Sequence, residues 1–255
     1  RTLDPNSYSN SWLPLDALRR RLLGAFQGYS RSEDFAACAQ LAAASYPLVS
    51  KPQAVELQAE NQATWGRILL AKADAAGPDK ADALRREGRM HLRLAGEDFA
   101  TLAELVRVER RYTEDLWNSA QAYLAGRDYL RAGQMAEKYL QEESRRRQAE
   151  GLTLLGEALL AQGRLDEAVK RLDECVRLHP REAASFRARL LAAQAYVEKG
   201  DHGRAETLLR ENLQADLLTP ASTEWRESLF DLGTLLHDTG RYEAAFNILA
   251  TEIQA

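Results

Sequence analysis

Apolar residues recur at helical spacing along most of this chain, and residues 149–180 show the pattern most clearly. Leu152, Leu155 and Leu159 follow one another three or four residues apart, as they would on one face of an α-helix. Gly163 interrupts this run, a second apolar run follows it, and Pro180 ends the segment. The pattern therefore predicts a helical hairpin, which is a pair of helices joined by a short turn.

The same pattern predicts further hairpins in residues 113–255, with units starting near residues 113, 149, 186 and 226. A turn glycine in each unit precedes a helix with an alanine where two helices are expected to pack closely. The glycines are Gly126, Gly163, Gly200 and Gly240, and the alanines are Ala132, Ala168, Ala205 and Ala245. Gly126 comes one residue earlier in its unit than the other three glycines.

The hairpin at 149–180 resembles a tetratricopeptide repeat. That consensus, of about 34 residues, places a large apolar residue, Leu-Gly, an aromatic, a small Ala, a second aromatic and a final Pro in order. Here these places hold Leu152, Leu155-Gly156, Leu159, Ala168, Leu172 and Pro180, with Leu replacing the aromatics. The chain is similar to bacterial-type tetratricopeptide proteins, clearly over 113–255 and loosely over 13–112. The resemblance implies an all-α, right-handed superhelical solenoid of helix-turn-helix repeats, continuous along the chain.

The N-terminal part is less regular. Residues 1–12 are polar and predict an extended lead-in, and residues 13–112 predict degenerate helical repeats. Helices are expected to stop at Pro47 and at Gly77-Pro78. For residues 78–110 we expect two helices meeting near Ala95-Gly96, with one long helix as the alternative.

Composition supports an all-helical protein, because Leu, Ala, Glu, Gln and Arg are abundant and only three of the 255 residues are Ile. The net charge is −4 and the isoelectric point is about 5.7. Arginine runs at 19–21 and 145–147 suggest nucleic acid as a partner, but no basic stripe recurs with the repeat. Nucleic acid is therefore not an expected partner.

No motif for catalysis, for a cofactor or for a metal stands out, so an enzyme is not predicted; an all-α enzyme or a helical regulatory segment is the alternative. Cys38 and Cys175 lie among Ala and Leu and are expected to be core thiols. The four histidines are scattered and are expected on the surface. No apolar run is long enough for a transmembrane segment.

The ends of the chain suggest a larger parent protein. The chain begins at Arg1 without a targeting segment, so a cytoplasmic and a periplasmic location are both open. The last helix carries Phe246, Ile248, Leu249 and Ile253 with no polar capping helix after it. This end is therefore expected to meet a continuation of the parent protein or another chain, for example by self-association.

In the tetratricopeptide family, the first helix of each unit lines a concave groove that receives a peptide or a partner's helix. Carried over by position, the resemblance implies these partner-binding residues: Glu114, Trp117, Gln121, Leu124, Glu150, Glu157, Leu160, Arg187, Leu190, Gln194, Val197, Phe230 and His237. Glu227 holds the second position of the last unit. The groove would have an apolar floor and a mostly acidic and amide flank, so the expected partner is a neutral or basic protein or peptide.

Within this set, Trp117 is the strongest candidate contact, because large aromatic side chains contribute much interface energy. The alternative is that the apolar members only pack neighbouring first helices together. The Lys, Asn and Arg clamp that holds a partner's terminal carboxylate in chaperone-binding members is absent, since only Arg187 fits it.

Overall fold

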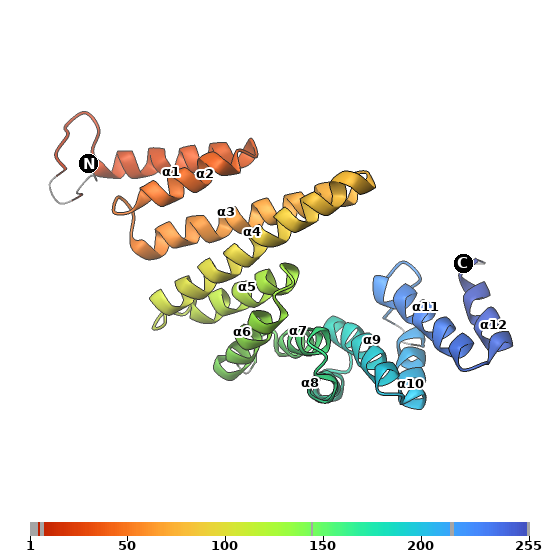
Figure 1. Ribbon diagram of the computed structural model, residues 1–255. Coiled ribbons are helices and arrows are strands. Elements are labelled where there is room, and N and C mark those ends of the chain that lie inside the picture. The colour runs from red at the N-terminus through yellow and green to blue at the C-terminus, as the bar shows by residue number, and fades with distance from the viewer. Residues whose placement is uncertain (1–4, 6–7, 144, 215–216, 254–255) are drawn as a thin grey trace. The chain divides into compact units, whose positions relative to one another are not determined.

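The computed structural model describes residues 5, 8–143, 145–214 and 217–253, apart from the side chains of 251–253, and in this part of the chain every regular element is an α-helix (Figure 1). The helices are α1 (Leu15–Arg31), α2 (Phe35–Ser45), α3 (Lys51–Asp74), α4 (Pro78–Leu105), α5 (Tyr112–Ala125), α6 (Tyr129–Glu142), α7 (Gln148–Ala161), α8 (Leu165–Leu178), α9 (Ala183–Glu198), α10 (His202–Leu213), α11 (Thr223–Asp238) and α12 (Tyr242–Ile253). The predicted all-α fold of helical hairpins is confirmed.

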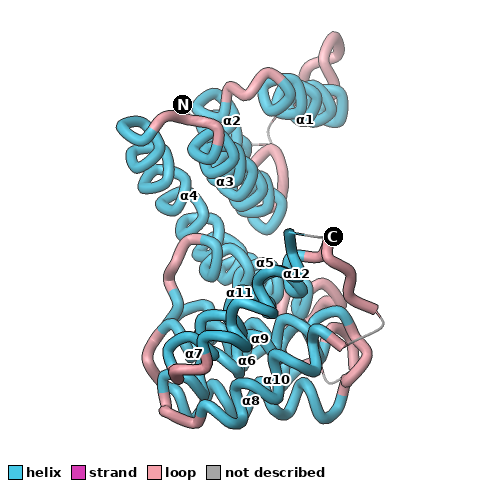
Figure 2. The backbone as a smooth tube through the Cα atoms, turned by 90° about the vertical axis from the view of Figure 1, so that its right-hand side faces the viewer, coloured by secondary structure: helices cyan, strands magenta, loops and turns pink. Residues whose placement is uncertain are grey.

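The chain forms two compact units, residues 1–139 (unit 1) and residues 140–255 (unit 2). Within each unit, helices that follow one another in the sequence pack against one another (Figure 2). The division falls inside α6. The predicted change from degenerate to regular repeats at residue 113 concerns sequence regularity, and it stays a prediction. In the predicted lead-in, residues 8–12 form no helix, and residues 1–4, 6 and 7 lie outside the described residues.

The helix starts follow from local chemistry. The Asp34 carboxylate accepts a hydrogen bond from the Ala37 N–H at the start of α2, and Ser50 does the same for Gln53 at the start of α3. Pro78 is the first residue of α4, where its missing N–H and fixed φ cost nothing. Because α2 ends at Ser45, before Pro47, and α3 ends at Asp74, before Gly77-Pro78, both predicted helix breaks are confirmed.

The structure corrects the expectation of two helices meeting near Ala95-Gly96, because α4 runs unbroken through both residues. Gly96 is buried and faces α5: a Cβ added there would lie 2.7 Å from the Tyr123 ring. Its carbonyl also accepts a hydrogen bond from the Ser119 hydroxyl at 2.7 Å. Gly96 thus allows two helices to approach closely, and a glycine used in this way looks like a turn glycine in the sequence.

A second close approach joins α3 and α4, where two glycines meet. A Cβ added to Gly66 would lie 2.7 Å from the Gly88 carbonyl oxygen and 2.7 Å from the Leu92 Cγ. A Cβ added to Gly88 would lie 3.0 Å from the Gly66 carbonyl oxygen. The two long helices of unit 1 therefore pack backbone against backbone at this crossing.

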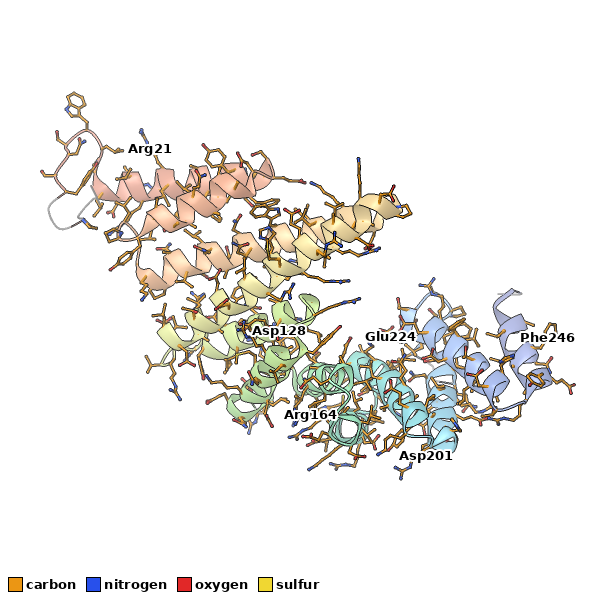
Figure 3. All side chains as sticks on the ribbon, in the orientation of Figure 1. Arg21, Asp128, Arg164, Asp201, Glu224 and Phe246 are labelled. Atoms are coloured by element: carbon orange, nitrogen blue, oxygen red, sulfur yellow. The ribbon has the colours of Figure 1, made fainter. Side chains whose placement is uncertain are left out.

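Five of the hairpins share one turn. In each, a residue with positive φ ends the first helix, and the N–H of the next residue donates to a carbonyl five positions earlier, which is the Schellman arrangement. Gly163, Gly200 and Gly240 hold the positive-φ position in unit 2, whereas Glu33 and Arg127 hold it in unit 1. The early glycine of the sequence, Gly126, has a negative φ, so the left-handed conformation falls on Arg127. Figure 3 labels Asp128, Arg164 and Asp201, which follow three of these residues.

The small positions predicted from the sequence are buried at the helix contacts, with Ala132, Ala168 and Ala205 0% exposed and Ala245 4% exposed. Both cysteines are also buried, as predicted. Cys175 Sγ lies 3.4 Å from the Thr153 hydroxyl, and burial raises the pKa of this thiol. These contacts are those of a packed core.

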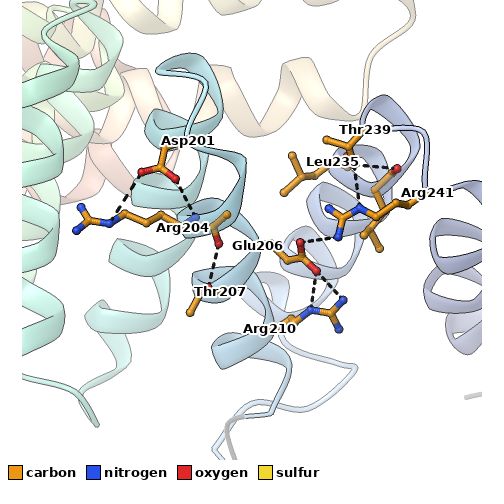
Figure 4. A network of polar contacts seen from close by, with 10 residues as sticks. Asp201, Arg204, Glu206, Thr207, Arg210, Leu235, Thr239 and Arg241 are labelled. Carbon is orange, nitrogen blue, oxygen red and sulfur yellow. Dashed lines mark hydrogen bonds and ion pairs between the residues drawn. The ribbon is translucent and has the colours of Figure 1, made fainter.

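Polar contacts also join successive hairpins of unit 2 (Figure 4). Glu206 on α10 accepts hydrogen bonds from Arg210, at 2.8 Å, and lies 2.8 Å from Arg241 in the next turn. Burial would raise the pKa of Glu206, but the hydrogen bonds from Arg210 and Arg241 outweigh it and lower that pKa. The glutamate therefore stays ionised and ties α10 to the hairpin of α11 and α12.

Candidate partner-binding surface

The first helices of the three hairpins in unit 2 lie side by side, because α9 packs against both α7 and α11. Their predicted partner-binding residues recur three, four or seven positions apart, which is one or two helical turns, so those of each helix share a face. We call this surface the first-helix face; it comprises Glu150, Glu157, Leu160, Arg187, Gln194, Val197, Glu227, Phe230, Asp231 and His237.

A row of charges crosses the first-helix face from α7 to α11. Arg187 Nη1 donates to Glu227 Oε2 at 2.8 Å, and its Nη2 donates to Glu157 Oε1 at 3.4 Å. A second contact runs beside it, since Gln194 Nε2 donates to Asp231 Oδ2 at 2.9 Å. The structure thus brings together Glu157, Arg187 and Glu227, which the resemblance had assigned to three different repeats.

Asp231 was absent from the predicted set, although it belongs to the face. It follows Glu227 by four residues, so both side chains project from the same side of α11. The helical spacing could have identified it. With Asp231 the face carries four carboxylates and one guanidinium, which makes its charge clearly negative.

The predicted apolar floor is discontinuous. Phe230 is 65% exposed and Val197 is 39% exposed, so both present apolar surface to solvent. Leu160 is partly buried and packs against the core. Leu190 is 0% exposed, so it packs the core and has no surface to present to a partner. The packing alternative therefore describes Leu190, whereas the Phe230 side chain is accessible at the surface.

The predicted members in unit 1 lie on α5. Trp117 is only 7% exposed, and its ring packs against Tyr139 on α6 with 5.3 Å between ring centroids. Gln121 is exposed, and Glu114 and Leu124 are half-buried. Trp117, the strongest candidate by residue type, thus contributes mainly to packing between α5 and α6.

His91 corrects the expectation that the histidines lie on the surface, because it is 5% exposed between α3 and α4. Its ring stacks on Trp65 with 3.8 Å between centroids, and its Nδ1 lies 2.6 Å from Gln62 Oε1. Burial lowers the pKa of this imidazole, which favours the neutral form. His237, in contrast, is exposed on the first-helix face.

Across the described residues, no group of three or more His, Cys, Asp or Glu side chains is arranged to hold a metal ion. Within the same part of the chain, no helix has the length and apolar character needed to cross a membrane.

Paired helices that stack in sequence order define a helical-repeat protein, and comparisons identify the kind of repeat. Residues 118–183 and 153–217 match the tetratricopeptide repeat family model. The resemblance to tetratricopeptide repeat proteins predicted from the sequence is confirmed. Folds of this kind generally mediate protein–protein interaction and are generally non-enzymatic.

Solved structures show the same fold at low sequence identity. One such structure contains the TPR-like repeats of a putative kinesin light chain from Podosopora anserina, which are nearly identical to one another. It is 16% identical to this chain, with a TM-score of 0.59, and the match covers 81% of this chain and 96% of that chain. MamA from residue 41 to its end, from Desulfovibrio magneticus RS-1, is 18% identical, with a TM-score of 0.53 over 76% and 94% of the two chains. No curated protein matches the chain.

Proposed function

We propose that this protein is an interaction scaffold, part of a larger protein, and that the first-helix face of unit 2 binds a neutral or basic peptide or partner helix. The observation that carries this proposal is the pairing of an exposed aromatic anchor, Phe230, with a surface of four carboxylates and one guanidinium. An apolar anchor on a face of mainly negative charge supplies both affinity and selection of the partner's charge.

Arg187 gives the face a further property. Its guanidinium already contacts Glu157 and Glu227, so its positive charge is largely compensated within the face. Glu150, in contrast, is exposed at the start of α7. A partner with Lys or Arg near an apolar residue would therefore be favoured over an acidic partner.

Peptide selection followed by affinity measurement tests this function. Peptides selected on the full chain from a random library are expected to be enriched in Lys or Arg beside an apolar residue. Phe230→Ala should weaken their binding about tenfold, measured by fluorescence anisotropy. The matched control is Tyr29→Ala on α1, because Tyr29 is an aromatic residue that is 43% exposed and lies outside the first-helix face. Equal losses in both variants, or enrichment in acidic peptides, would contradict the proposal.

A second role is favoured by three partly exposed apolar side chains of α12. Tyr242 is 64% exposed, Phe246 is 73% exposed and Leu249 is 37% exposed, and Figure 3 labels Phe246 on this helix. We propose that this apolar surface supports self-association of the chain, because adjacent exposed apolar side chains mark association surfaces. Sedimentation of the wild type and of Phe246→Glu tests it: the wild type should associate with increasing concentration, and the variant should remain monomeric. A monomeric wild type at all concentrations would exclude self-association.

A further inference from the structure

Unit 1 contains a cavity of about 350 Å³ that is separate from the first-helix face. The end of α2, the N-terminal half of α3 and the middle of α4 form its walls. Three alanines and Val55 give it an apolar lining, and four polar side chains converge on it: Tyr46, Lys51, Gln58 and Asp98. An apolar cavity with a few convergent polar groups is the usual form of a small-ligand site.

The four polar side chains lack partners in the structure. None of them takes part in a hydrogen bond or ion pair among the described residues. Other charged groups of unit 1 do have partners: Arg111 contacts Glu56 at 2.7 Å and Asp115 at 3.2 Å. Tyr46 and Lys51 are exposed to solvent, whereas Gln58 and Asp98 are half-buried. Because a carboxylate partly removed from water is costly unless it is paired or hydrogen-bonded, the unpartnered Asp98 points to a ligand group that supplies its partner.

Asp98 shows this cost directly. Burial, and secondarily the neighbouring Glu97, raises the pKa of its carboxyl to about 6. The other ionisable groups at the cavity are the Lys51 ammonium on α3 and the Tyr46 hydroxyl at the end of α2. A cation bound beside Asp98 would stabilise the carboxylate form.

Lys51, Val55 and Gln58 lie along one stripe of α3, so Lys51 and Gln58 are about 10 Å apart along the helix axis. The lining of the cavity thus includes an ammonium on α3 and a carboxylate on α4, together with the alanines and Val55. Lys51 would repel a ligand that is only cationic, and Asp98 would repel a ligand that is only anionic. A ligand that carries both charges satisfies both groups.

We infer that this cavity binds a small zwitterion of the amino-acid or short-peptide class, with the ligand's ammonium beside Asp98, its carboxylate beside Lys51 and its side chain against the alanines and Val55.

Titration calorimetry of the full chain with the common amino acids and a set of dipeptides tests this site. At least one of these zwitterions is expected to bind saturably. Its N-acetylated form, which lacks the ammonium, and its amide, which lacks the carboxylate, should each bind about tenfold more weakly. No saturable binding by any probe at millimolar concentration would overturn the inference, as would equal affinity for the blocked forms.

Variants test whether Asp98 and Lys51 contact the two charged groups of the ligand. Asp98→Asn and Lys51→Gln should each weaken binding of the best probe about tenfold. Asp82→Asn is the matched control, because Asp82 is also on α4 but its side chain is 74% exposed and lies outside the cavity. Affinity of the wild type should also fall below about pH 6 as Asp98 takes up a proton, and this fall should be absent in Asp98→Asn. Circular dichroism establishes that each variant is folded. Binding unchanged by both cavity variants would place the ligand elsewhere.

Discussion

The two units use glycine for different purposes. In unit 2, glycines end the first helices with positive φ, and within helices Gly156 makes room for the Leu172 side chain. In unit 1, Gly66 and Gly88 let two backbones touch, and a non-glycine residue occupies each positive-φ turn position. Unit 2 thus follows the repeat consensus, whereas unit 1 depends on contacts particular to this sequence.

Helix length shows the same contrast. The helices α3 and α4 have 24 and 28 residues, whereas the helices wholly within unit 2 have 12 to 16. Longer helices need a closely fitted crossing, which the glycine pair and the stack of Trp65 on His91 supply. Unit 1 should therefore be sensitive at a few specific positions, and unit 2 at the positions that every repeat shares.

The largest effect is expected from Gly66→Ala. The new Cβ would lie 2.7 Å from the Gly88 carbonyl oxygen, and a backbone atom inside a helix cannot move away easily. We expect a loss of about 3 kcal/mol in the free energy of unfolding, measured by urea denaturation followed by circular dichroism. Gly156→Ala should cost less, about 1 to 2 kcal/mol, since it meets only the Leu172 side chain.

Gly24→Ala in α1 provides the control for this pair, because a Cβ there meets nothing within 4 Å. It should stabilise the protein by up to about 1 kcal/mol through helix propensity. Equal losses for Gly66→Ala and Gly156→Ala would show that the buried Leu172 side chain yields no more easily than the Gly88 backbone.

A smaller effect is expected from exchanging the turn residues. Gly163 has φ +74°, so Gly163→Ala should lose about 1 kcal/mol in the free energy of unfolding. Arg127 has φ 57°, so Arg127→Gly should relieve the same strain and gain up to about 1 kcal/mol. Thermal denaturation checks both, with Gly203→Ala as a control at ordinary φ and without a close contact. A loss of stability in Gly163→Ala together with a gain in Arg127→Gly would support one shared turn conformation. A loss of stability in both variants would contradict it.

The contrast between the two units also explains which parts of the fold could be predicted from the sequence. The turn glycines and small alanines of unit 2 act locally and at a fixed period, so their pattern predicted the hairpins correctly. Gly96 acts through α5, which is distant in the sequence, and it was misread as a turn. His91 is buried because Trp65 and Gln62 lie opposite it on another helix, which no local pattern records.

The candidate surface shows the same limit. Position in the repeat identified Glu157, Arg187 and Glu227, whose contacts run between equivalent helices. Periodicity alone could not separate the exposed Phe230 from the buried Leu190 and Trp117, because burial depends on the next helix. The cavity beside Asp98 is lined from three helices and has no period, so no local sequence pattern could indicate it.

The smallest effect is expected from the pH dependence of unit 1. Burial lowers the pKa of His91 below its ordinary value of about 6.5. As pH falls below about 6.5, the unfolded chain binds this proton before the folded chain does, so the free energy of unfolding should decrease. The slope should be a fraction of the roughly 1.4 kcal/mol per pH unit that one full proton would give.

The variant His91→Phe separates this contribution from that of Asp98, whose pKa of about 6 has the opposite effect. Folding favours protonation of Asp98, so its contribution increases stability as pH falls through about 6. His91→Phe keeps a flat ring against Trp65 but removes the titrating group. Urea denaturation between pH 7.5 and 5.5 should show a steeper loss of stability towards low pH in the wild type than in the variant. Parallel curves would mean that His91 is protonated equally in both states, and the buried stack would then not distinguish unit 1 by its pH response.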